Sequence, residues 1–121
     1  MSDLAPLLQR FFADRLDGQM KASAHTKAAY ADTFRLLLLY ARDRTGTAPS
    51  ALRISDLDAD LIGAFLQHLE TDRGNSVSTR NARRTAIRSF FTYASYRAPD
   101  DAVVISRVLA IPAKRTKTTI V

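Results

Sequence analysis

A row of arginines in the last third of the chain has the residue types and the spacing to bind a ligand. Arg80, Arg84 and Arg88 recur every four residues, so on a helix they would line one flank, and the stretch 78–91 contains no acidic residue. A guanidinium group can hold a phosphate, or the edge of a guanine, through two hydrogen bonds, and the amide of Asn81 can read adenine in the same way. The flank therefore predicts contact with a polyanion.

A solvated helix face with salt bridges is the ordinary explanation for such a run of charge. Like charges four residues apart on a helix repel each other by a few tenths of a kcal/mol per pair, and no Asp or Glu on the same helix offsets them. Arg83 falls nearer the apolar side of that helix, where its stem can simply pack.

The division of charge along the chain supports a polyanionic partner. The net charge of +6 splits into −2 over residues 1–72 and +8 over residues 73–121. A soluble surface needs mixed charges but not segregated ones, so the asymmetry favours nucleic acid.

Two further groups of residues extend the predicted contact surface. "SAHTK" at 23–27 offers Ser23 as a helix N-cap and places polar side chains where backbone N–H groups favour phosphate, although capping explains His25 and Thr26 equally well. The basic C-terminal tail can touch phosphates or can be a plain flexible tag. From residue types and spacing, the predicted DNA-binding residues are His25, Thr26, Lys27, Arg80, Asn81, Arg84, Arg88, Lys114, Arg115 and Lys117.

Catalysis and metal binding have little support in the sequence. The two histidines, His25 and His68, lack a metal-ligand spacing, and no glycine-rich phosphate loop is present. The alternating aspartates at 56, 58 and 60 lack the glycine and distal glutamate of a calcium loop, and helix capping explains them better. We therefore expect no cofactor, no metal and no small-molecule substrate.

Composition predicts the setting in which the chain works. The absence of cysteine favours a reducing, cytoplasmic environment, and the first residues lack the basic region of a secretory signal. The longest apolar run, at 36–41, is too short to cross a membrane.

Hydrophobic periodicity predicts an all-α fold, a compact four-helix orthogonal bundle with a short fifth helical turn. Gly18 is expected to end the first helix, Ser55, Asp56 or Asp58 to cap the third, and Ser76 or Ser78 to cap the fourth. The third helix should end before the break at 72–76, and 45–57 should be the longest loop. The other predicted helices cover 3–17, 24–44, a stretch ending near 97, and 101–111. The predicted domain covers 1–111, and a basic linker covers 112–121.

Several phrases in order resemble the N-terminal, core-binding domain of tyrosine recombinases, the phage-type integrases. They are "Thr26-x-x-x-Tyr30-x-x-x-Phe34", "Asp56-Leu57" with "Ile62-x-x-Phe65-Leu66-x-x-Leu69", "Gly74-Asn75-Ser76-x-x-Thr79-Arg80-Asn81" with "Ile87-Arg88-Ser89-Phe90-Phe91", and "Ile111-Pro112-Ala113-Lys114-Arg115". Together they span 23–115.

The resemblance implies a SAM-like domain that clamps double-stranded DNA from one side and works with a separate catalytic domain. The DNA contacts that it implies fall on 25–27 of the second helix and, on the fourth helix, on Ser78, Thr79, Arg80, Asn81, Arg84 and Arg88. It also implies that the first helix can touch neighbouring recombinase protomers, although core packing suits Leu4, Leu7, Leu8 and Phe11 better. The family's catalytic His-x-x-Arg does not occur, because Leu69, Glu70 and Thr71 follow His68. We therefore expect no strand cleavage by this chain itself.

Two other functions are compatible with the same residues. One is a stand-alone helix-turn-helix transcriptional regulator, although the turn before the fourth helix exceeds the usual ~3–4 residues. The other is a helical protein–protein adaptor whose basic charge is incidental.

Overall fold

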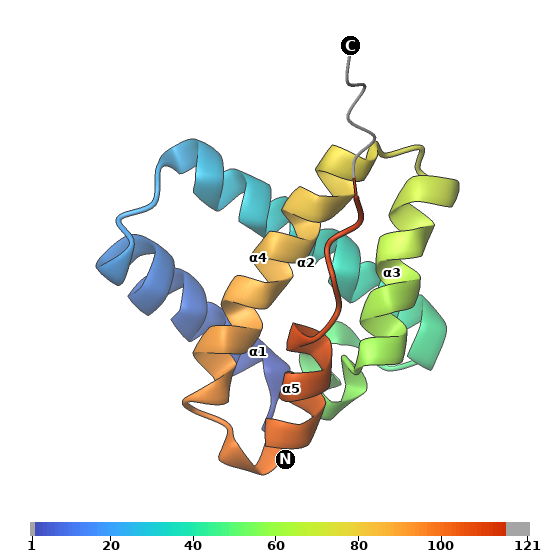
Figure 1. Ribbon diagram of the computed structural model, residues 1–121. Coiled ribbons are helices and arrows are strands. Elements are labelled where there is room, and N and C mark those ends of the chain that lie inside the picture. Colours follow the sequence, from blue (N-terminus) through green and yellow to red (C-terminus); the bar gives the residue numbers. More distant parts are fainter. Residues whose placement is uncertain (1, 116–121) are drawn as a thin grey trace.

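Helices account for most of the chain, and no β-strand occurs within residues 2–115, the part that the computed structural model describes. The predicted all-α bundle is therefore confirmed (Figure 1). The α-helices are α1 (Leu4–Arg10), α2 (Ala24–Thr45), α3 (Ala59–Thr71), α4 (Val77–Ser95) and α5 (Ala102–Leu109). A π-helix, η1 (Phe11–Gln19), continues α1, and three short 3-10 turns are η2 (Pro49–Ala51), η3 (Ile54–Asp56) and η4 (Pro99–Asp101). No helix among the described residues is long and apolar enough to span a membrane.

Local capping explains where the three long helices begin. Ser23, Asp58 and Ser76 have extended backbones, and each side chain accepts a hydrogen bond from the backbone N–H three residues ahead. These bonds satisfy donors that a helix start would otherwise leave free. The structure thus selects Asp58 and Ser76 among the predicted caps. Gly46 ends α2 in the left-handed conformation (φ 73°), as favoured for glycine.

The first helix ends later than predicted, and Gly18 does not end it. Residues 11–19 continue in π-helical geometry, which carries the chain past Gly18 to Gln19. The reversal is made instead by Lys21, which adopts a positive φ of 46°, and by a hydrogen bond from the Ala22 N–H to the Leu16 carbonyl (2.8 Å). The prediction failed because a single glycine need not be left-handed when the turn that follows supplies the reversal.

The predicted loop 45–57 is a structured connection that contributes to the core. Leu52, Ile54 and Leu57 are fully buried, and the 3-10 turns η2 and η3 lie within this stretch. The N-terminus is attached to it, because the Leu4 N–H donates to the Leu52 carbonyl and the Ile54 N–H donates to the Ser2 carbonyl, both at 3.0 Å.

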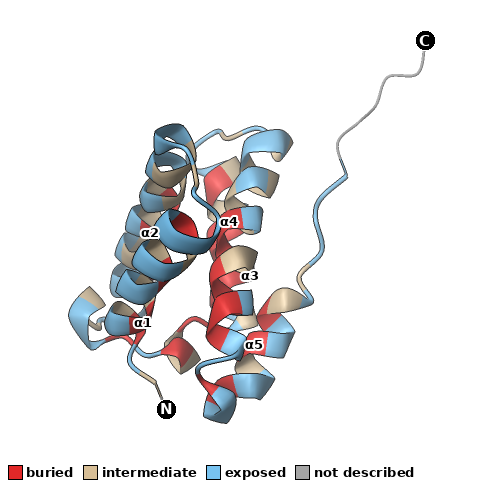
Figure 2. Cartoon of the chain, turned by 90° about the vertical axis from the view of Figure 1, so that its left-hand side faces the viewer, coloured by how far each residue is buried: buried red, intermediate tan, exposed pale blue. Residues whose placement is uncertain are grey.

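The core is built around a cluster of aromatic rings between η1, α2 and α4. Phe11 is fully buried and its ring packs against Phe12, Phe34 and Phe90, with centroids 5.5–6.2 Å apart. Tyr93 joins the same cluster from α4. Buried residues face inward on each helix, as Figure 2 shows, and the exposed residues of α2 and α4 lie on their outer faces.

Candidate nucleic-acid interface

The N-terminal halves of α2 and α4 diverge from the contact between Arg83 and Asp32, and the two helix starts stand apart in Figure 1. Between them these halves line one crevice of about 460 Å³, to which His25, Thr26, Ser78 and Thr79 contribute. His25, Ser78 and Thr79 are exposed, and Thr26 is half-buried. The structure thus places four residues that sequence reasoning selected from two separate motifs around one opening.

Both helices begin with the same hydrogen-bonded pair. In α2 the Ser23 hydroxyl donates to the Thr26 hydroxyl (3.1 Å) and accepts from the Thr26 backbone N–H (3.1 Å). Ser76 and Thr79 repeat this arrangement in α4, with the same two distances. Backbone N–H groups and the positive helix dipole at these ends attract anions, and two such ends on one crevice reinforce each other.

Arg83 forms the floor of the crevice and is structural. Its guanidinium donates to the Asp32 carboxylate (3.0 Å) and to the Thr33 hydroxyl (3.0 Å), and its side chain is only 19% exposed. The pKa of Asp32 lies below its usual value because hydrogen bonds from Arg35 and then from Arg83 stabilise the carboxylate, although partial burial opposes this. Arg83 was predicted to pack through its stem, and the ion pair adds a tie between α2 and α4.

This tie makes stability depend on pH. Because the pKa of Asp32 is lowered in the folded protein, its contribution is present above the ordinary pKa of 3.8 and is lost as the pH falls below it. We expect Asp32→Asn to reduce the free energy of unfolding at pH 7 by ~1 kcal/mol or less, since the carboxylate is partly exposed. Urea unfolding of both proteins at pH 7 and pH 3 measures this, and a difference that persists unchanged at pH 3 would contradict it.

The arginine flank of α4 is already occupied by the protein's own C-terminal segment. Arg88 donates to the Leu109 carbonyl, the Arg84 Nε donates to the Ile111 carbonyl (2.8 Å), and Arg80 donates to the Pro112 carbonyl (3.4 Å). The three arginines do line one flank, as their spacing predicts. The sequence could not reveal these acceptors, because every residue has a main-chain carbonyl.

Asn81 takes part in the same contact. Its amide donates to the Lys114 carbonyl (2.7 Å) and its carbonyl oxygen accepts from the Lys114 backbone N–H (2.9 Å). The Asn81 side chain therefore binds both the N–H and the C=O of Lys114. Lys114 also pairs through its Nζ with Glu70 on α3 (3.1 Å). Sequence reasoning had no means of finding Glu70, which lies 44 positions from its partner.

The remaining predicted contacts have mixed surroundings. Lys27 forms an ion pair with Asp17 of η1 (2.8 Å), and both side chains remain about half exposed. Arg115 is exposed. Lys117 lies outside the described residues. Within the described part of the chain, no three His, Cys, Asp or Glu side chains come together in a way that could hold a metal ion.

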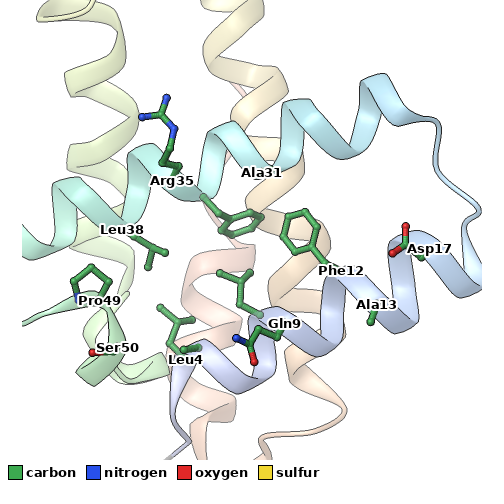
Figure 3. Close-up of a pocket in the computed structure, with 13 residues that line it drawn as sticks. Leu4, Gln9, Phe12, Ala13, Asp17, Ala31, Arg35, Leu38, Pro49 and Ser50 are labelled. Carbon is green, nitrogen blue, oxygen red and sulfur yellow. The ribbon is translucent and has the colours of Figure 1, made fainter.

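A second hollow lies on another side of the bundle, between α1–η1 and α2. This groove of about 800 Å³ has mainly apolar walls, and Leu4, Phe12 and Leu38 extend toward it from facing elements (Figure 3). Leu4, Leu7 and Phe11 are buried, which confirms core packing for them, whereas Leu8 is half-buried and lines the groove.

The family is decided by a comparison with models of known families. Residues 8–98 match the model described as "Phage integrase, N-terminal SAM-like domain". The chain belongs to this family. The match covers η1 through α4, and therefore the helices that form the crevice.

Two curated proteins from Sinorhizobium fredii (strain NBRC 101917 / NGR234) are similar to this integrase domain. One, named as a candidate integrase/recombinase y4rC, is 51% identical over 99% of the chain, and the other, named likewise as y4rD, is 48% identical over 93%. The chain spans 36% and 40% of their respective lengths, so it corresponds to a minor part of each. No solved structure matches the integrase domain at a significant level.

Proposed function

We propose that this integrase domain binds one face of double-stranded DNA at a recombination half-site, as the DNA-clamping part of a site-specific tyrosine recombinase. The observation that carries the proposal is the crevice between the N-terminal halves of α2 and α4, lined by His25, Thr26, Ser78 and Thr79. Strand breakage and rejoining would then belong to a different part of the parent protein, as the longer relatives named as integrase/recombinases suggest.

The charges around the crevice fit this role. Backbone N–H groups at the two helix starts can hold phosphate oxygens, and hydroxyl groups of Ser78 and Thr79 can add contacts to the sugar–phosphate backbone. Lys27 and Arg80 supply positive charge at the same ends of α2 and α4, and Arg115 adds a cation that remains exposed. Contacts of this kind position a protein on DNA, while base edges confer specificity.

Salt dependence provides the test of DNA binding. If the domain neutralises about five phosphates, the logarithm of its affinity for duplex DNA should fall with the logarithm of salt concentration with a slope of about −4 to −5. Fluorescence anisotropy with a labelled duplex between ~0.05 and ~0.3 M salt measures the slope. An absence of saturable binding at ~0.15 M salt would instead indicate the protein–protein adaptor.

A stand-alone regulator makes a different prediction in the same assay. Such proteins bind paired half-sites as dimers about one helical turn apart. Five residues, 72–76, separate α3 from α4, which exceeds the ~3–4 residues of a helix-turn-helix. The recombinase domain is therefore expected to bind a single half-site as a monomer, with any contact between neighbouring protomers made through the apolar groove beside Leu8 and Phe12.

A further inference from the structure

We propose that Asn81, Arg84 and Arg88 form a docking track for main-chain groups, and that its occupant is the chain's own segment Leu109–Lys114. In this assignment Arg84 and Arg88 are positioning residues that fix the direction in which the chain leaves the bundle. Their bonds are made to the segment, and their effect on DNA is indirect.

The segment runs antiparallel to α4. Its first contact, at Leu109, is with Arg88, and its last, at Lys114, is with Asn81, so successive residues of the segment meet successively earlier residues of the helix. Figure 1 shows the segment leaving α5 and passing between α3 and α4 toward the start of α4. The contacts are distributed along the whole segment, which makes them a track and not a single tether.

Arg84 and Arg88 bind carbonyls at and just after the end of α5. Four residues of α-helix rise about 6 Å along the axis. Leu109 is the last residue of α5 and Ala110 keeps right-handed helical dihedral angles (φ −81°, ψ −9°), so the chain leaves helical geometry only after Ala110. Arg88 therefore binds the Leu109 carbonyl at the end of α5, and Arg84, one turn earlier on α4, binds the Ile111 carbonyl two residues further along the segment.

The segment also offsets the repulsion between the positive charges of Arg80, Arg84 and Arg88. Three guanidinium groups on one flank repel each other, and the pKa of Arg84 is lowered by partial burial and by the charges of Arg88 and Arg80. Main-chain carbonyl oxygens carry partial negative charge and are aimed at these groups. The segment can therefore offset the repulsion that a polyanion was expected to offset.

Contacts at Lys114 hold the end of the segment between α3 and α4. Asn81 of α4 binds the Lys114 main chain through two hydrogen bonds, while the Lys114 side chain pairs with Glu70 of α3, whose side chain is only 13% exposed. Arg115 follows at once, near the N-terminal end of α4. Resting on the proposed function, this means that the track holds a cation near the N-terminal end of α4.

The Lys114 backbone N–H reports directly on whether the segment is docked. In the 121-residue chain, we expect Arg84→Ala with Arg88→Ala to speed hydrogen exchange of this amide at least about tenfold and to speed tryptic cleavage after Lys114 and Arg115, because the amide is protected by Asn81 only while the segment lies on the track. Arg44→Ala with Arg107→Ala removes two exposed arginines elsewhere and should change neither readout.

A second pair of variants separates geometry from charge. Arg84→Lys with Arg88→Lys keeps both charges and most of each stem but lacks the guanidinium fork. If the guanidinium geometry holds the segment, hydrogen exchange at the Lys114 amide should be faster in this pair too. The salt dependence of DNA binding should then be the same as in the unmodified domain. In the alanine pair the slope should change by less than about one.

One result would overturn the proposal. If the alanine pair left exchange at Lys114 as in the unmodified chain and lowered the salt slope by about two, the two arginines would be phosphate contacts. If the proposed function is wrong, the unmodified domain will show no salt-dependent binding to duplex DNA. The hydrogen-exchange measurement is made without DNA, so it would still show whether the segment is docked on the track.

Discussion

Thr26→Glu together with Thr79→Glu is expected to weaken binding to duplex DNA about 100-fold at low salt, because each new carboxylate at the proposed interface costs ~1.4 kcal/mol, or about tenfold, against phosphate. The free energy of unfolding should not fall. Both threonines stand three residues after the serine that caps their helix, so glutamate completes a capping box and also favours the positive end of the helix dipole.

A matched variant controls for the change in net charge. Thr45→Glu with Thr92→Glu places the same two charges on exposed sites near the opposite ends of α2 and α4. It should leave affinity within about threefold of the unmodified domain at ~0.15 M salt, where distant charges are screened. Equal losses in the two variants would show that affinity follows net charge alone and would remove the assignment to the crevice.

Phe11→Ala should have the largest effect on stability, lowering the free energy of unfolding by ~3–5 kcal/mol. The ring is fully buried and contacts aromatic rings from α2 and α4, so its removal leaves a cavity at the junction of three elements. Urea unfolding followed by circular dichroism measures the loss. Phe12→Ala, at the half-buried rim of the groove, should cost less, and a larger loss at Phe12 than at Phe11 would contradict the placement of the core.

The sequence predicted well those features that depend on local chemistry. Helix starts at Ser23, Asp58 and Ser76 follow from side chains that satisfy nearby backbone donors, and the apolar stripes of α2 to α4 follow from helical periodicity. The co-location of 25–26 with 78–79 was expected from the family resemblance, because no periodicity within one helix can place two helices on one crevice.

Features that depend on distant partners could not be predicted. The spacing of Arg80, Arg84 and Arg88 specified a shared flank, but the acceptors on it are main-chain carbonyls, which every residue possesses. The ion pairs of Lys27 with Asp17 and of Lys114 with Glu70 likewise need the tertiary fold. The prediction for Gly18 failed for a different reason, because the helix continues past the glycine to Gln19 and the chain reverses at Lys21, which has a positive φ.

Chemical-shift mapping during a titration with duplex DNA tests the proposed interface most directly. The largest changes in backbone amide signals are expected at residues 24–27 and 77–80, at the two helix starts that share the crevice. Smaller changes are expected at Arg84 and Arg88, whose guanidinium groups bind the C-terminal segment. Saturable binding whose largest changes fall instead on the apolar groove beside Leu8 and Phe12, with the two helix starts unaffected, would contradict the crevice as the DNA-binding site.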